Sequence, residues 1–166
     1  MKRNWFGILA VTALGAFAQS ANAQQTWSAV LTGADEVPPI SSPATGTFTA
    51  TVASDGSISF TLTFQGLAGN PTFSHIHFGQ PGVAGGVMIF LCGGGAQPDC
   101  PAATSGTVQG SIRLSNVTGP ATQGVDPGQL FEAMQAVSNG NGYVNIHNAR
   151  FPPGEIRGQV KIVPAI

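Results

Sequence analysis

Charged side chains are scarce in this chain. Among its 166 residues are six Lys or Arg and seven Asp or Glu, so charged residues make up 8% of the sequence. An ordinary soluble domain carries about 25%. Coiled coils, charged disordered tails and nucleic-acid-binding proteins all depend on many charges, so the composition argues against each of these classes. The length suits one domain with a hydrophobic core of its own.

Common catalytic and nucleotide-binding motifs are also missing. There is no Gly-x-Ser-x-Gly nucleophile elbow, and no glycine-rich segment has the spacing of a phosphate-binding loop. The run of three glycines at residues 93–95 is expected to form a flexible loop tip instead. The sequence therefore offers no catalytic residues, and a binding protein is favoured over an enzyme.

The first 23 residues have the features of a secretory signal peptide. Two basic residues precede an apolar stretch over residues 5–18, and residues 21–23 read Ala-Asn-Ala, a small-x-small cleavage pattern. The apolar stretch is shorter than the roughly 20 residues that a membrane span needs. We therefore expect residues 1–23 to be removed and a mature domain, residues 24–166, to be periplasmic or secreted. An uncleaved membrane anchor is the alternative.

Export changes the interpretation of the two cysteines, Cys92 and Cys100. They are separated by a loop rich in glycine. An oxidising compartment favours a disulfide across this loop. A thiolate pair for metal or redox chemistry is the alternative, but the spacing is not Cys-x-x-Cys and no histidine is near in sequence.

Most of the mature chain alternates apolar and polar residues with a period of two. Residues 47–52 and 57–64 show this pattern, which predicts strands with one face on a core. The turn-forming residues between them predict a hairpin. The same criteria predict further strands at residues 27–33, 72–78, 86–92, 105–115, 142–148 and 155–163.

One segment, at about residues 126–138, has helical spacing. It begins with Asp-Pro, and Leu130, Phe131, Met134 and Val137 form an apolar stripe that we expect to pack on the core. About eight strands and one short helix predict an all-β fold, a Greek-key β-sandwich.

The three histidines all fall in predicted strands. Alternation places His75 and His77 on one side of their strand, with Ile76 on the other. In the segment 143–147, His147 is on the side opposite two apolar residues. If the apolar residues face the core, all three histidines face outward together.

Two interpretations of these histidines stay open. If the two strands are neighbours, the imidazoles can converge on one ion, and three nitrogen donors suit zinc or copper with a position left for water or substrate. Otherwise they form a plain surface cluster. The sequence does not show that the strands are adjacent.

Neighbours of the histidines can also be proposed. After His147 the chain turns back, and Glu155 and Arg157 are predicted to point outward on the histidine side. Glu155 would then accept a hydrogen bond from an imidazole, and Arg157 would attract an anion. An ordinary solvated ion pair between the two is the alternative. Glu36, in the turn before two prolines, is a further candidate neighbour.

Five stretches, spread over nearly the whole mature chain, carry a family resemblance. They are Leu-Thr-Gly-Ala-Asp-Glu-Val-Pro-Pro at 31–39, Ala-Thr-Gly-Thr at 44–47, His-Ile-His at 75–77, Tyr-Val-Asn-Ile-His at 143–147 and Pro-Gly-Glu-Ile-Arg-Gly-Gln at 153–159. Together these stretches resemble the CHRD domain, a module of chordin that is also found singly in exported bacterial proteins. The resemblance implies an immunoglobulin-like β-sandwich and an extracellular setting, but it does not supply a partner.

A looser resemblance is to the copper/zinc superoxide dismutase sandwich, in which histidines on an outer sheet face, including a His-x-His pair, bind copper. It implies a copper role for His75 and His77, with His147 as a third ligand. The chain departs from that pattern because it has no fourth histidine, no bridging histidine and no zinc cluster.

Three functional hypotheses follow. The first is an exported domain that binds copper or zinc through His75, His77 and His147. The second is an extracellular or periplasmic protein-interaction module without metal. The third, least favoured, is a superoxide-dismutase-like copper enzyme. The sequence specifies neither a protein partner nor an oligomeric state.

Overall fold

A computed structural model describes residues 24–164 of the chain. The predicted signal peptide, residues 1–23, lies outside the described residues. The all-β class with one short helix is confirmed. The elements are β1 (Gln25–Thr32), β2 (Thr45–Val52), β3 (Ile58–Gln65), β4 (Pro71–Phe78), β5 (Gly86–Cys92), β6 (Gly106–Ile112), α1 (Leu130–Ser138), β7 (Gly142–Asn148), β8 (Ile156–Gln159) and β9 (Lys161–Pro164), with short 3-10 turns at Gly33–Asp35, Leu114–Asn116 and Ala121–Gln123.

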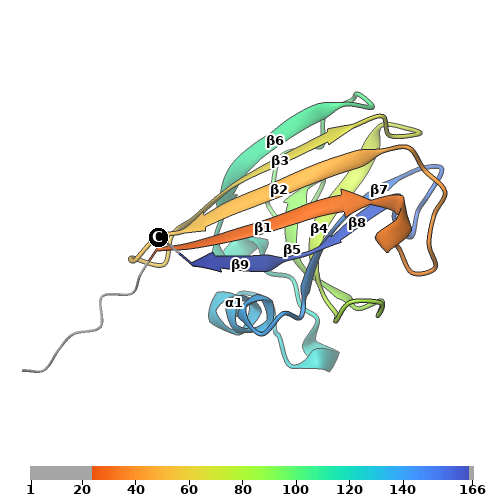
Figure 1. The fold of residues 1–166 in the computed structure, drawn as a ribbon. Coiled ribbons are helices and arrows are strands. Elements are labelled where there is room, and N and C mark those ends of the chain that lie inside the picture. Colours follow the sequence, from red (N-terminus) through yellow and green to blue (C-terminus); the bar gives the residue numbers. More distant parts are fainter. Residues whose placement is uncertain (1–23, 165–166) are drawn as a thin grey trace, which may run out of the picture.

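All nine strands of residues 24–164 belong to one antiparallel sheet. Its order is β5-β4-β7-β8-β1-β2-β3-β6, and β9 pairs with β1 beside β8. The sheet curves strongly, so that β1, β2, β3 and β6 lie in front of β4, β5 and β7 (Figure 1). The two layers of the predicted sandwich are therefore joined through hydrogen-bonded neighbours. The junction is made at Thr32 of β1, which pairs with Arg157 of β8.

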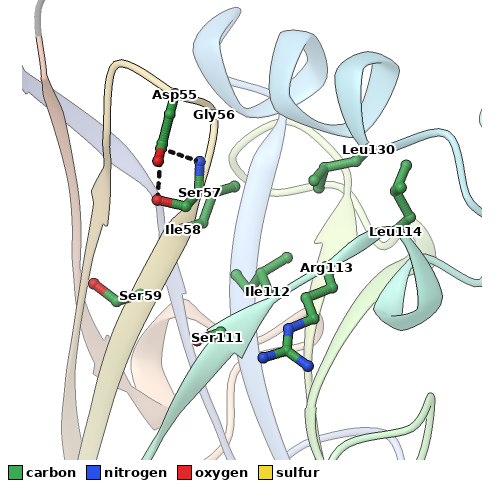
Figure 2. Close-up of a pocket in the computed structure, with 10 residues that line it drawn as sticks. All are labelled: Asp55, Gly56, Ser57, Ile58, Ser59, Ser111, Ile112, Arg113, Leu114 and Leu130. Carbon is green, nitrogen blue, oxygen red and sulfur yellow. Dashed lines mark hydrogen bonds between the residues drawn. The ribbon is translucent and has the colours of Figure 1, made fainter.

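The predicted hairpin is formed by β2 and β3. Phe48 pairs with Leu62, and Ala50 with Phe60, so that the apolar residues of both strands share the inner face. The turn is closed by Asp55, whose Oδ1 accepts hydrogen bonds from the backbone N–H and the hydroxyl of Ser57 (Figure 2). The hairpin thus supplies one wall of a core that the other layer completes with Ile76, Ile89, Val144 and Ile146.

The last predicted strand is interrupted. Residues 155–163 form β8 and β9, separated at Val160, whose side chain is buried and whose N–H donates to the carbonyl of Gly142. β8 pairs with β7, whereas β9 pairs only with β1. Because of the break, the segment pairs with β7 through β8 and with β1 through β9.

Helix α1 is shorter than predicted and packs differently. It begins at Leu130, because residues 126–129 form a turn in which the Gln129 side chain accepts the N–H of Asp126. Ala133 and Val137 are buried, but Phe131 is 66% exposed. The expectation that Phe131 packs on the core was wrong, since the buried stripe of the helix is centred on its alanines.

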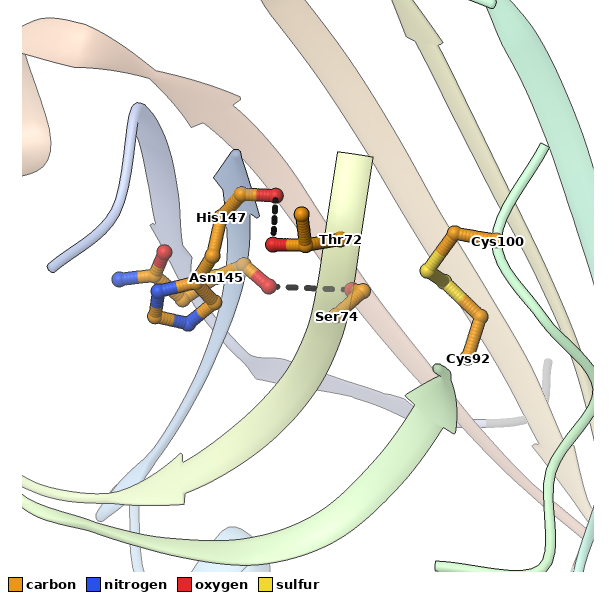
Figure 3. Close-up of a disulfide and its surroundings, with 6 residues drawn as sticks. All are labelled: Thr72, Ser74, Cys92, Cys100, Asn145 and His147. Atoms are coloured by element: carbon orange, nitrogen blue, oxygen red, sulfur yellow. Dashed lines mark hydrogen bonds between the residues drawn. A yellow bond between two sulfur atoms is a disulfide. The ribbon is translucent and has the colours of Figure 1, made fainter. Parts of the chain in front are cut away.

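The disulfide between Cys92 and Cys100 is present. Cys92 ends β5 and belongs to the hydrophobic core. In Figure 3, β4 lies between this disulfide and His147 of β7. The thiolate alternative is excluded in this structure, because both sulfur atoms are bonded to each other.

Candidate metal centre

The strands that carry the histidines are neighbours. β4 and β7 pair antiparallel, with Phe73 opposite His147, His75 opposite Asn145 and His77 opposite Tyr143. Alternation then puts the three imidazoles on one face, with ring centroids 4.9 to 5.6 Å apart. One ring nitrogen from each histidine lies within 4.8 Å of the other two. The strand adjacency that the sequence left open is thus present.

The histidines face away from the core but are not open to solvent. His75, His77 and His147 are only 6–7% exposed, and every residue of β7 is buried. The prediction of an outward-facing cluster was correct for the face and wrong for the exposure. The loop between β4 and β5 lies over this face through Gly85, and the loop between β7 and β8 through Pro152, each hydrogen-bonded to one of the histidines.

Backbone carbonyls fix two of the imidazoles. The Nδ1 atom of His77 lies 3.0 Å from the carbonyl oxygen of Gly85, and the Nδ1 atom of His147 lies 3.0 Å from that of Pro152. A carbonyl oxygen only accepts hydrogen bonds, so each Nδ1 carries the proton and donates it. Each Nε2 is left with an unprotonated lone pair.

The two lone pairs point into the same space. Nε2 of His77 lies 3.4 Å from Nε2 of His147. Because both are acceptors in this tautomer, they cannot hydrogen-bond to each other. The separation of the two nitrogens is compatible with both binding one ion, since nitrogen ligands usually lie about 2.0–2.1 Å from zinc.

Burial keeps the rings neutral. The pKa of His75 is lowered to about 3. The main cause is burial, and the positive charges that His147 and His77 would carry add to it. Burial lowers the pKa of His77 to about 4, although the hydrogen bond to Gly85 acts in the opposite direction. Burial also lowers the pKa of His147. At neutral pH all three imidazoles therefore keep their lone pairs for a metal.

His75 differs from the other two. Its Nδ1 is buried and has no hydrogen-bond partner among the described residues. Its ring stacks on Phe73, with centroids 5.8 Å apart, and meets Phe90 edge-on at 4.4 Å. Leaving a buried ring nitrogen unpaired costs about 1–3 kcal/mol, which a metal ion would offset.

Arg157 lies on the histidine side of β8, as predicted, and is buried. Its guanidinium stacks on the Tyr143 ring at 3.4 Å and donates to the carbonyl of Gln80 at 3.0 Å. The other neighbour of the Tyr143 ring is His77, stacked with centroids 4.8 Å apart. The Tyr143 ring therefore contacts both Arg157 and His77.

Glu36 reaches the same face from the segment after β1. Its Oε2 accepts a hydrogen bond from Asn145 at 3.2 Å. Its Oε1 and the Oδ1 of Asn145 are buried and have no hydrogen-bond partner within residues 24–164. Burial raises the pKa of Glu36 to about 7, against the hydrogen bond from Asn145 and the charge of Arg157, which lower it. No hydrogen bond joins this carboxyl group to an imidazole among the described residues.

Glu155 is fully buried and serves the loops. Its carboxylate accepts hydrogen bonds from the Ser42 hydroxyl at 2.7 Å, from the Ala68 N–H at 3.0 Å and from the Asn148 side chain. The predicted imidazole contact is not among its hydrogen bonds, since its two oxygen atoms are directed at Ser42, Ala68 and Asn148. Glu155 instead joins three loops beside β7.

Several residues around the site were not predicted. Tyr143 and Asn145 share the histidine face by simple alternation, so the sequence held a signal for them. The sequence held no signal for Gly85 and Pro152. They act through their backbone carbonyls, which every residue has, so the residue type does not reveal the role. Phe73 and Phe90 were missed because only the strand order β5-β4-β7 brings both beside His75.

The surface also has a hollow away from the histidines. It lies between the β2–β3 turn, the end of β6 and the start of α1 (Figure 2), and Arg113 is on its wall. None of its lining residues belongs to the histidine group. That group is the one set of three or more histidine, cysteine or acidic side chains within metal-binding distance found in residues 24–164.

The fold and site define a class: a small all-β domain with a buried three-histidine cluster and one disulfide. The CHRD domain family model matches residues 27–160, and the chain belongs to this family. Comparisons with curated proteins and with solved structures give no match. In residues 24–164 no helix is long and apolar enough to cross a membrane.

Proposed function

We propose that this CHRD domain is exported and binds one transition-metal ion, copper or zinc, through His75, His77 and His147. The observation that carries the proposal is the pair of Nε2 lone pairs of His77 and His147, 3.4 Å apart and locked by carbonyls behind them. Two neutral acceptors held this close together repel each other, and a cation bound by both lone pairs removes that repulsion.

The ligand atoms limit which metal ions the site can bind. Three neutral imidazoles suit zinc and copper, whereas calcium and magnesium prefer oxygen ligands. Thiolates are not available, because both cysteines are in the disulfide. Three protein ligands leave a coordination position for water or an external ligand. When bound, the ion would supply a Lewis acid or, for copper, a redox centre.

Export is supported by two features. The disulfide Cys92–Cys100 is typical of oxidising compartments, and residues 1–23 have the signal-peptide pattern. N-terminal sequencing of protein recovered from the periplasm or medium tests this part. A mature chain that starts at Gln24 supports export and cleavage, whereas an intact N-terminus on cell-retained protein contradicts it.

The metal content of the purified protein tests the metal-binding part of the proposal. Mature protein is purified without a tag or chelator and analysed by mass spectrometry for metals, beside variants in which each histidine is replaced by Gln. We expect about one equivalent of copper or zinc in the wild type and a loss of metal in each variant. Gln109→Ala, an exposed change on β6, is the control that keeps its metal.

An empty wild-type protein that also takes up neither added copper(II) nor zinc(II) contradicts the metal proposal. Circular dichroism of each variant separates loss of metal from loss of fold.

A further inference from the structure

His75 is held in place differently from its two partners. His77 and His147 are each anchored by an Nδ1–carbonyl hydrogen bond, whereas the Nδ1 of His75 has no partner in residues 24–164. What fixes the His75 ring is packing between Phe73 and Phe90. These two phenylalanine rings also contact each other edge to face, with centroids 6.5 Å apart.

A glycine loop supports Phe90 from behind. A methyl group placed on Gly94 would lie 2.5 Å from the Phe90 ring, and one on Gly95 would lie 2.7 Å from it. There is no room for a side chain at either position. Residues 93–95, expected from the sequence to be a flexible tip, are therefore packed directly against the aromatic wall of the histidine cluster.

The disulfide holds this loop against the ring. Cys92 follows Phe90 by two residues, and its bond to Cys100 closes the loop. Within the closed loop, the Gly93 N–H donates to the Pro98 carbonyl at 2.8 Å and the Gln97 N–H to the Gly94 carbonyl at 2.9 Å. Two further hydrogen bonds tie the loop to its surroundings, from the Asn116 side chain to the Gly95 carbonyl at 2.7 Å and from the Gln97 side chain to the Ser111 carbonyl at 3.0 Å. The disulfide adds a covalent link to these hydrogen bonds.

We infer that Phe90 is a positioning residue for His75, and that the Cys92–Cys100 disulfide tightens metal binding by keeping the glycine loop against Phe90. The inference rests on the proposed metal-binding function. Its physical basis is that an imidazole without a hydrogen bond keeps one orientation only while its neighbours fill the space around it. The disulfide acts through Phe90 and His75, without contributing a ligand.

A double-mutant cycle in copper(II) affinity tests the path of the effect. Phe90→Ala and the double change Cys92→Ser, Cys100→Ser are each expected to weaken copper(II) binding about 10-fold. In a His75→Ala background, Phe90→Ala is expected to change the remaining affinity by less than about twofold, because its effect passes through the missing ring. Phe90→Tyr keeps the ring and should restore binding.

Two controls separate positioning from general destabilisation. Phe131→Ala removes a phenylalanine that is exposed on α1, and Val108→Ala opens a small space in the core at β6. Both should leave copper(II) affinity unchanged. If Phe90→Ala weakens binding equally with and without His75, or if Val108→Ala weakens it as much, the inference is overturned.

A measurement without metal keeps the inference distinct from the proposed function. In the ring ¹⁵N–¹H NMR spectrum of the apo protein, Phe90→Ala should shift or broaden the His75 signals, while those of His77 and His147 stay. Unchanged His75 signals would overturn the positioning role. A wild-type protein that binds no copper(II) or zinc(II) would overturn the metal proposal and with it the affinity claim, whatever the NMR result.

Discussion

The Nε2 atoms of His77 and His147 lie 3.4 Å apart, and neither can donate a hydrogen bond to the other. The cause is at the far side of each ring, where a carbonyl oxygen accepts a hydrogen bond from the protonated Nδ1. Two loops far apart in the chain thus impose one tautomer on both histidines. This relationship gives the domain its most specific chemical feature.

Ring tautomers provide the first prediction. In the apo protein at pH 7, ¹⁵N ring shifts should show His77 and His147 as neutral, with the proton on Nδ1. Addition of zinc(II) should shift the Nε2 signals and leave the Nδ1 signals protonated. An Nε2-protonated form of either ring would contradict the hydrogen-bond assignment on which the site rests.

The second prediction concerns Gly85, whose carbonyl oxygen accepts a hydrogen bond from Nδ1–H of His77. A Cβ at this position would overlap the carbonyl oxygen of Phe78, so Gly85→Ala must displace the loop. We expect zinc(II) affinity to fall about 10-fold, because the ring loses its orienting acceptor. Competition titration against a chelator measures the change.

The matched control for Gly85 is Gly82→Ala in the same loop. Nothing lies within 4 Å of a Cβ placed there, and its φ is +76°. This change carries a backbone cost of about 1 kcal/mol and should leave metal affinity as it is. Equal losses of affinity in both variants would show that the Gly85 carbonyl has no special role.

The third prediction concerns Glu155, the buried carboxylate that joins the loops through Ser42, Ala68 and Asn148. Glu155→Ala leaves these donors without an acceptor and should lower the free energy of unfolding by about 3 kcal/mol. Urea unfolding measures it. Glu155→Gln keeps an acceptor oxygen and should lose less; an equal loss in both would point to the charge rather than the hydrogen bonds.

The fourth prediction is a pH dependence from Glu36. Its pKa is about 7 in the folded protein and 4.5 ordinarily, so the folded state binds the extra proton between these values. Binding of this proton stabilises the folded state. The stabilisation is fully present below about pH 4.5 and is lost as the pH rises through 7. Nearby Arg157 lowers this pKa and Asp35 raises it.

Glu36→Gln mimics the protonated acid and removes this dependence. Compared with the wild type, the variant should be more stable by about 1–2 kcal/mol at pH 8 and equally stable at pH 4.5. Thermal unfolding at the two pH values measures the difference. A gain of the same size at both values would contradict a titrating Glu36.

The sequence by itself determined the strands and their faces. Period-two alternation is a local property, so it gave the hairpin of β2 and β3 and the common face of the three histidines. The turn-forming residues around segments 86–92 and 142–148 gave the bounds of β5 and β7. The disulfide followed from two cysteines across a short glycine-rich loop. Each of these depends on residues close together in the chain.

Only the tertiary structure decided which strands meet and what covers them. Alternation assigns a residue to a face but does not say whether a loop lies over that face, so the burial of the histidines could not be predicted. The same is true of Glu155, whose partners are 7 to 113 residues away in sequence. The curvature of the sheet and the closure of its loops, which depend on long-range packing, convert three aligned histidines into a buried cluster in which His77 and His147 have defined tautomers.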